Sequence, residues 1–394
     1  MALTKLNTLS LADDAITSAK IADNAIVTAA IADDAVTTAK TTVTSTNPNI
    51  LINGDMAIAQ RATSSTVTGI KTVDRWSAAW GGGGGITQSQ VALTSGGAYD
   101  EGHRHAFKMA VTSANSANAR YAQVNYKVES QQIRNSGWQY NSASSYVTIS
   151  FWVKASLAGT YWLSFYCPDT NTQYYSTSFA LSAATWTKIT KTFPGGSNIT
   201  FNDDTGNGLQ IDIYLDYGTD LTASDATLNS WHTFASGKYM TDFAQSWFNT
   251  GSATFEVTGC KLEIGQSATT FEKPDYTTEL KKCFRYYEKI TNTTGFSMLG
   301  LASNTTAAYF DLYYEPKRAN PSLVFPTASV TGNGVVALTA NGSYPTDATG
   351  TLTATKIGKT SCRIDAESFG GLTDDGPSWL YWVAENSIEI SAEL

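Results

Sequence analysis

The beginning of the chain carries a pattern of apolar and polar positions that repeats every ten residues. Residues 11–40 read LADDAITSAK IADNAIVTAA IADDAVTTAK, in which apolar pairs alternate with a polar pair and a threonine-rich stretch. The apolar positions follow helical spacing, and the aspartates suit helix N-caps. A continuous helix would rotate its apolar stripe by roughly 80° per repeat. The pattern therefore predicts short helical turns, each restarted at its polar pair, rather than a straight coiled coil.

A repeat this short and this poor in large apolar residues cannot bury its apolar side alone. Identical units, in neighbouring repeats or neighbouring chains, have to cover that side. We expect residues 1–47 to form an attachment segment, a trimeric shaft and a linker, with contacts between chains made by Ile16, Ile21, Ile26, Ile31 and Val36. The alternative is a disordered tail, which the Thr- and Ala-rich composition permits and the regularity of the repeat opposes.

From residue 48 onward the pattern changes to short segments in which apolar and polar positions alternate with period two. Examples are SYVTISFWVKAS, LQIDIYLDY and ATFEVTGCKLEI, separated by Gly, Ser and Asn turns. Such alternation predicts strands with one buried and one solvated face, and their number predicts a jelly-roll β-sandwich over residues 48–275. We expect Phe151, Trp152 and Trp162 to pack in its core, and the five glycines 81–85 to form a flexible surface loop.

Residues 276–290 break this strand pattern. Leu280, Cys283, Phe284 and Tyr287 recur at helical spacing, with charged residues on the other side, and predict a short connecting helix. Strand-like segments resume over residues 291–394, which we expect to form a smaller β-sandwich. The fold class is therefore mainly β: a repeat shaft, a jelly roll, a short helix and a second sandwich.

Composition narrows the function classes. The 394 residues carry a net charge of −8 and no cluster of Lys and Arg, which argues against a nucleic-acid partner. No apolar stretch approaches the roughly 20 residues that span a bilayer, and the start lacks the apolar segment of a secretory signal. We expect a soluble chain made in a cytosol. Four scattered cysteines without a CxxC motif are expected to be reduced packing residues: Cys167, Cys260, Cys283 and Cys362.

Catalytic chemistry has little support in the sequence. His103 and His105 could seed a metal site, but no companion ligand stands at suitable spacing, so we expect a polar loop and no metal. The motifs of serine hydrolases, zinc proteases and P-loop proteins are absent. Acid pairs in Gly-rich turns, such as residues 203–204 and 374–375, are usually solvated turn residues and less often calcium ligands. We therefore expect a protein without catalytic activity or cofactor.

Glycan binding needs only an exposed aromatic face and a few polar groups. Aromatic residues in predicted loops are the informative ones, although rings at strand ends also commonly cover the edge of a core. On this criterion the candidate glycan contacts are Trp138, Tyr140, Tyr344 and Trp379, with Asp374 and Asp375 beside the last of these.

Several phrases resemble a family of bacteriophage tail-fibre and minor structural proteins. They are NILINGDMAIAQR, VDRW, ISFWVKAS, VTGCKLEIGQSATTFEKPDYTTELKKCFRYYEK and the N-terminal IADDAVTTAK repeats. Family members frequently have Val-Gln in place of Cys260-Lys261. The resemblance implies a homotrimeric virion fibre that is held at its N-terminal end by a phage tail or adaptor protein. It also implies a first sandwich similar to a carbohydrate-binding module.

The expected function is therefore that of a phage tail-fibre subunit, located in the virion, whose C-terminal end meets a polysaccharide or protein receptor on the host surface. Two alternatives remain open from the sequence. One is a fibre or decoration protein fixed to the capsid. The other is a polysaccharide-degrading fibre whose active site forms between subunits.

Overall fold

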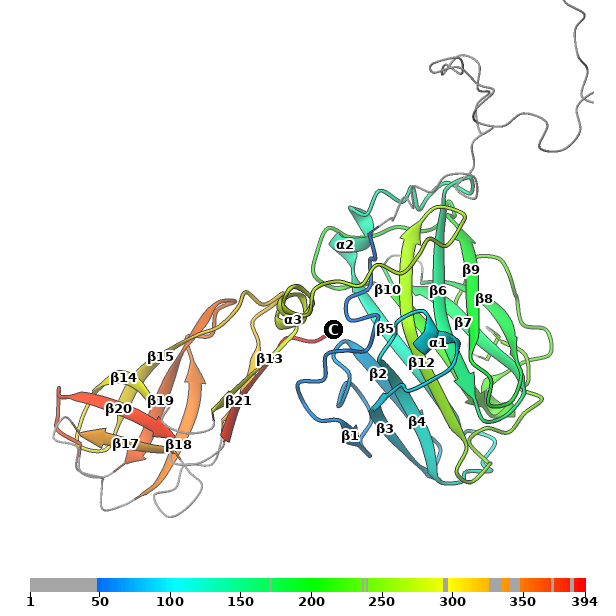
Figure 1. The fold of residues 1–394 in the computed structure, drawn as a ribbon. Coiled ribbons are helices and arrows are strands. Elements are labelled where there is room, and N and C mark those ends of the chain that lie inside the picture. The colour runs from blue at the N-terminus through cyan, green and yellow to red at the C-terminus, as the bar shows by residue number, and fades with distance from the viewer. Residues whose placement is uncertain are drawn as a thin grey trace, which may run out of the picture. The chain divides into compact units, whose positions relative to one another are not determined.

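A computed structural model describes residues 48–169, 172–235, 237–238, 240–292, 297–325, 335–339, 348–369, 372–382 and 386–394. The decapeptide repeat, with the proposed contacts at Ile16, Ile21, Ile26, Ile31 and Val36, lies outside the described residues, as does Tyr344. The described part belongs to one compact unit, Asn47–Leu394. Its strands form antiparallel sheets arranged as sandwiches, so the prediction of a mainly β fold is confirmed (Figure 1).

Two six-stranded sheets make up the first sandwich. One sheet has the order β1 (Ser64–Ser65), β3 (Gly85–Ala92), β4 (His105–Ser113), β12 (Thr254–Ile264), β6 (Tyr146–Ala155) and β9 (Thr187–Pro194). The other has the order β11 (His232–Thr233), β8 (Gln173–Leu181), β7 (Gly159–Cys167), β10 (Asn207–Tyr217), β5 (Tyr121–Glu129) and β2 (Trp76–Gly81). The chain passes repeatedly between the two sheets, as in a jelly roll.

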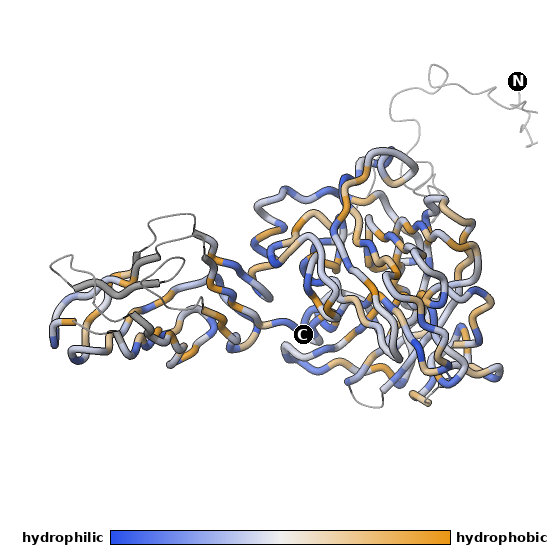
Figure 2. The backbone as a smooth tube through the Cα atoms, turned by 90° about the horizontal axis from the view of Figure 1, so that it is seen from below, coloured by the Kyte–Doolittle hydropathy of each residue, from blue (hydrophilic) through white to orange (hydrophobic). Residues whose placement is uncertain are grey.

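The core of this sandwich lies between the inner faces of the two sheets. Phe107, Phe151 and Phe255 come from one sheet and Leu163 and Ile211 from the other, and all are buried. These residues occupy alternate positions of their strands, which is why the period-two pattern was readable in the sequence. Figure 2 shows apolar positions recurring along these strands, between hydrophilic turns.

A three-stranded and a six-stranded sheet make up the second sandwich. The small sheet has the order β13 (Tyr287–Asn292), β21 (Asn386–Ser391) and β16 (Ser322–Val324). The larger has the order β17 (Val335–Thr339), β20 (Pro377–Trp382), β14 (Ser297–Ala302), β15 (Ala308–Tyr313), β19 (Ser361–Phe369) and β18 (Ala348–Thr355). Phe310, Ile364 and Leu380 of the larger sheet pack with Ile388 and Ile390 of the smaller one.

The helices in the described part are short: α1 (Gly97–Asp100), α2 (Ser130–Arg134) and α3 (Tyr276–Phe284). In α3 the Asp275 carboxylate accepts a hydrogen bond from the backbone N–H of Thr278 and caps the helix, while Cys283 is buried. The helix ends earlier than the sequence pattern suggests, because Tyr287 already pairs with Ser391 in a β-ladder. No helix of the described residues is both long and apolar enough to cross a membrane.

The glycine run differs from the loop that we expected. Gly81 ends β2 and Gly85 begins β3, so only three glycines turn the chain from one sheet to the other. Gly82, Gly83 and Gly84 have φ angles of 80°, 104° and 70°, which residues with a Cβ rarely adopt. The run is therefore a tight corner of the sandwich.

Candidate functional site

The outer face of the sheet β11-β8-β7-β10-β5-β2 carries an unusual concentration of polar side chains. Along β10, Ile211 and Ile213 point into the core, so Gln210, Asp212 and Tyr214 point to the opposite face. The same alternation holds on the neighbouring strands. Asp212 lies opposite Asn125 on β5 and opposite Ser164 on β7, although the three are far apart in the sequence.

The strand register arranges these side chains in three rows across the sheet. The first row is Tyr174, Tyr166, Gln210 and Lys127; the second is Ser176, Ser164, Asp212, Asn125 and Ser77; the third is Ser178, Trp162, Tyr214, Gln123 and Ala79. We call the first two rows the polar platform. Neighbouring strands are about 4.8 Å apart, so the six strands of the sheet span roughly 24 Å.

Apolar residues pack over the third row and form a wall along one side of the polar platform. Trp162 and Tyr214 are buried in a small apolar cluster with Tyr217 and Met240, and Leu221 and Phe243 pack against it. Trp162 is thus buried, but in this outer cluster and not in the main core where we expected it. Phe151 does lie in the main core, and Trp152 is half-buried, with its Nε1 donating to Glu101 at 3.0 Å.

Asp212 is the acid of the polar platform and is almost completely buried. Its carboxylate accepts hydrogen bonds from Gln210 Nε2 at 2.8 Å, Gln123 Nε2 at 3.3 Å and Tyr214 Oη at 3.4 Å. Burial raises the pKa of Asp212 to about 7, and the hydrogen bonds from Gln210 and Tyr214 only partly oppose this. The network also fixes the amide group of Gln210 in the platform and that of Gln123 in the third row.

Aromatic rings lie at the β8–β7 end of the polar platform. The rings of Tyr166 and Tyr174 stack with centroids 4.4 Å apart, and Phe234 lies 5.2 Å from Tyr174. Both tyrosines are half-buried and Phe234 is exposed. Phe234 lines a cavity of about 470 Å³ together with Thr172, Gln173, Asn198 and Thr233.

The opposite end of the polar platform opens into a second cavity of about 500 Å³. Ser77, Asn125, Lys127 and Gln210 of the platform line it, with a loop wall from Thr68 to Lys71 and residues from the end of the second sandwich. The platform thus joins an aromatic end to a polar cavity on one sheet face. Stacking rings and oriented amide groups are the components that sugar recognition requires.

The spacing of carboxylates on β10 is unsuited to glycoside hydrolysis. Asp216 is the next carboxylate on β10, four residues from Asp212, which corresponds to roughly 14 Å along a strand. A register shift between Tyr214 and Asp216 also pairs it with Ala122, a residue of the core, so it does not share the face of Asp212. Paired acids of inverting glycosidases are about 6.5–9.5 Å apart, and those of retaining enzymes are closer. Asp216 is moreover paired with Arg120 at 3.1 Å and accepts from the backbone N–H of Phe248. Asp212 and Asp216 therefore do not form the acid pair of a glycosidase.

The residues predicted from the sequence do not gather at one place. Trp138 is buried with only 2% of its surface exposed, and its Nε1 donates to the Ser145 carbonyl, so no face of its ring can receive a sugar. Tyr140 packs edge-on against Phe201 and Trp138. Trp379 is half-buried on β20, opposite Leu299, an exposed residue of the second sandwich.

The acidic turns and the histidines have simple environments. Asp374 and Asp375 form an exposed turn before β20, and residues 203–204 are also exposed. His103 is buried rather than in a solvated loop, and Asp55 and Lys273 contact its Nδ1. In the described part of the chain, no cluster of His, Cys, Asp and Glu could hold a metal ion. The four cysteines are free and buried, as predicted.

Sequence reasoning missed the polar platform because it searched the loops for exposed rings. A usable signal was present in LQIDIYLDY, whose polar positions include two aspartates within an otherwise apolar strand. Acids are rarely buried without a partner, so their place in a strand could have marked this face. Their neighbours on β5 and β7 could not have been identified without the register.

No protein-family model matches the chain, and no curated protein matches it either. Among solved structures, the chain is similar to the enzymatically active domain of tailspike protein 4 from bacteriophage CBA120, with 9% identity and a TM-score of 0.31 over 55% of this chain and 21% of that one. It is also similar to a family 11 carbohydrate-binding module from Clostridium thermocellum, solved with a β-1,3-1,4-mixed-linked tetrasaccharide, with 13% identity and a TM-score of 0.25 over 51% of this chain and 94% of the module.

A cyclase from Fischerella sp. TAU is a further structural neighbour, with 10% identity and a TM-score of 0.31 over 57% of this chain and 100% of the cyclase. This chain spans about a fifth of the length of the tailspike domain that it matches.

Proposed function

We propose that this chain is a subunit of a phage fibre that attaches to the host surface by binding a glycan on the polar platform of the first sandwich. The observation that carries the glycan part is the shared sheet face of the stacked Tyr166 and Tyr174 rings and the amide groups of Gln210 and Asn125. Asp212 is buried beneath them and holds the Gln210 amide in place. A sugar ring can stack on the aromatic end while its hydroxyls exchange hydrogen bonds with the amides.

Binding of the full chain to an array of bacterial surface oligosaccharides tests this part. Tyr166→Leu removes a stacking ring at the platform and should lower the affinity by up to about tenfold, because an aromatic contact contributes roughly 0.5–1.5 kcal/mol to binding. Tyr313→Leu is the matched control, because Tyr313 is a 73% exposed tyrosine on β15 of the second sandwich. Equal affinity of the wild type and Tyr166→Leu would contradict the proposal.

The same array decides where the glycan binds. Trp379→Ala and Tyr344→Ala change the two aromatic positions that the sequence suggested in the second sandwich. If these variants lose binding and Tyr166→Leu keeps it, the glycan site lies in the second sandwich and the platform is not the site. Release of shortened oligosaccharides from the probe would instead favour the polysaccharide-degrading alternative.

The fibre part of the proposal is supported by the decapeptide repeat and by the resemblance of the sequence phrases. The repeat requires other chains to cover its apolar side, so the full chain should be a trimer in solution. Light scattering of the full chain and of a variant that lacks residues 1–46 is the appropriate measurement. A full chain that is a folded monomer would contradict the fibre, and imaging of the labelled virion would distinguish a tail fibre from a capsid fibre.

A further inference from the structure

The outer face of the large sheet of the second sandwich carries exposed apolar side chains. On β14, Leu299 and Leu301 are 66% and 52% exposed, whereas Met298 points into the core. Tyr309 of β15 is exposed opposite Leu301, and Trp379 of β20 is half-buried opposite Leu299. Residues that pair across antiparallel strands share a face of the sheet. We call Leu299, Leu301, Tyr309 and Trp379 the apolar face.

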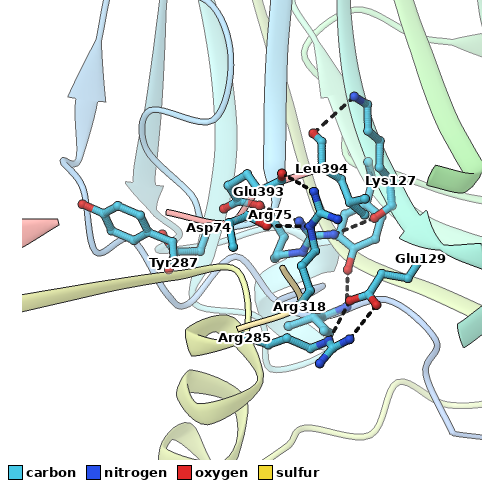
Figure 3. A network of polar contacts seen from close by, with 12 residues as sticks. Asp74, Arg75, Lys127, Glu129, Arg285, Tyr287, Arg318, Glu393 and Leu394 are labelled. Carbon is cyan, nitrogen blue, oxygen red and sulfur yellow. Dashed lines mark hydrogen bonds and ion pairs between the residues drawn. The ribbon is translucent and has the colours of Figure 1, made fainter. Parts of the chain in front are cut away.

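The contacts between the two sandwiches do not cover the apolar face. Glu393, which follows β21, pairs with Arg75 of the first sandwich at 2.6 Å, and Arg285, which follows α3, pairs with Glu129 at 2.7 Å (Figure 3). In the described part of the chain, these paired residues come from the ends of α3 and β21 and not from β14, β15 or β20. The apolar face is therefore available to another molecule.

Charged residues border the apolar face on the β19 side. Arg363 of β19 lies opposite Asp311 of β15 and pairs with Asp365 at 2.6 Å. The Arg363 guanidinium also lies 4.2 Å from the centre of the Tyr309 ring and covers one side of it. Glu367 is the next outward residue of β19 and is exposed. An apolar centre with a polar rim is the composition of protein–protein interfaces.

The chemistry of the apolar face suits a protein partner better than a sugar. Leu299 and Leu301 are its most exposed members, and a leucine side chain has neither a flat ring for stacking nor a hydrogen-bonding group. One side of the Tyr309 ring is already occupied by Arg363. Contact with another apolar surface, in contrast, removes both leucines from water and is favourable.

The size of the apolar face is compatible with a contact among three chains. The exposed parts of its four side chains amount to about 400 Å², which is comparable with the largest apolar patches of monomers, and these are often binding sites. Three such faces around one axis bury about 1,200 Å² in total, which reaches the lower limit of specific interfaces. Tyr313, opposite Ser361 at the end of β15, lies at the margin and is not counted.

We propose that the apolar face packs against the same face of two other copies of this chain, so that the second sandwiches form a subunit contact of the fibre. This contact rests on the fibre part of the proposed function, because the decapeptide repeat brings the three chains together. Chains that are already joined meet at a high effective concentration, so a contact of modest area is sufficient. The other copies are also present before a host is met, whereas an uncovered apolar patch promotes aggregation of the free fibre.

Spin labels on the full chain test whether the apolar faces meet. Leu301→Cys places a label in the apolar face, and Val324→Cys is the matched control, at a 60% exposed position of β16 on the small sheet of the same sandwich. The four native cysteines are buried, so the label should react with the introduced thiol. Facing sheets pack roughly 10 Å apart, so labels at position 301 of neighbouring chains should lie within about 20 Å, and those at position 324 further apart.

A double variant measures whether the contact stabilises the trimer. Leu299→Gln combined with Leu301→Gln removes the two most exposed apolar side chains of the apolar face. The concentration below which the full-chain trimer dissociates in a dilution series should rise at least tenfold. Val324→Gln is the matched control and should leave this concentration unchanged. An unchanged dissociation of the double variant would overturn the contact.

The outcomes separate the subunit contact from the fibre. A full-chain trimer whose labels are as far apart at position 301 as at position 324 would overturn the contact and leave the fibre intact. If the labels at position 301 are far apart and the double variant no longer adsorbs to host cells, the apolar face binds a host protein and the contact is likewise overturned. A full chain that is a folded monomer would refute the fibre and the contact together.

Discussion

Asp212→Asn should abolish a specific loss of stability that occurs as the pH rises from 5 to 8. The side chain is 2% exposed, and no cation is among the hydrogen-bond partners of its carboxylate in the described residues. Desolvation raises the pKa of this carboxyl from 3.8 to about 7. Between these two values the folded chain keeps a proton that the unfolded chain releases, so folding stability falls as the pH rises through this range.

The magnitude follows from the two pKa values. Integrating the proton difference from pH 5 to pH 8 gives a loss of about 2.5 kcal/mol in the free energy of unfolding. Asparagine has the same shape without the titration. Its Oδ1 can accept from Gln210 and Gln123, and its Nδ2 can donate to Tyr214 Oη, so the network keeps its connectivity. Relative to the wild type, the free energy of unfolding of the variant should therefore rise by about 2.5 kcal/mol between pH 5 and pH 8.

Urea denaturation of the full-length wild type and variant at pH 5 and pH 8, followed by tryptophan fluorescence, measures this difference. Asp74 is also buried with its pKa raised, but it is present in both proteins and its effect cancels. Asp225→Asn is the control: Asp225 is exposed, and Lys238 lowers its pKa, so it stays ionised from pH 5 to 8 in both states. If the pH profiles of wild type and Asp212→Asn are parallel, the reasoning about the buried carboxyl is wrong.

Three further outcomes are expected. Arg75→Met should cost about 3 kcal/mol in the free energy of unfolding, measured by urea denaturation, because Glu393 loses its 2.6 Å partner and keeps Arg61 at 3.1 Å. Trp138→Ala should cost about 3–5 kcal/mol through the cavity that it leaves, whereas Trp379→Ala should cost at most about 1 kcal/mol, and thermal unfolding compares the two. Because burial raises the pKa of the cysteine thiols, all four should resist a thiol reagent until denaturant is added.

Much of the fold follows from local periodicity in the sequence. The alternation in β6 identifies which residues face the core, and Phe151 lies there as expected. In β12 a register shift between Thr258 and Lys261 breaks the alternation, and this shift turns Cys260 toward the core. The helix prediction is less accurate at its end. Tyr287 continues the helical spacing, but its hydrogen bonds go to Ser391, which lies about a hundred residues further along the chain. A partner so distant cannot be read from local spacing.

The sequence pointed to loops as the candidate site, whereas the polar platform lies on strands, and the difference has a physical reason. A tryptophan in a polar loop sequence can cover the edge of a core, as Trp138 does beside Phe201. The polar platform instead depends on strand register, which brings Asn125, Ser164 and Asp212 together. One-residue slips in any of these strands would send its side chain to the other face. The site is therefore a property of the assembled sheet.

The energetics of Asp212 connect the stability prediction to the proposed function. A buried carboxyl without a cationic partner destabilises the fold above neutral pH, and an amide would satisfy the same neighbours at lower cost. If the platform served folding alone, Asp212→Asn would improve stability without any loss. If the platform binds a glycan, the buried carboxylate orients the Gln210 amide more strongly than an asparagine side chain does. The variant should then bind more weakly while it unfolds at higher urea concentration at pH 8. Opposite changes in stability and affinity in one variant would identify Asp212 as a residue retained for binding.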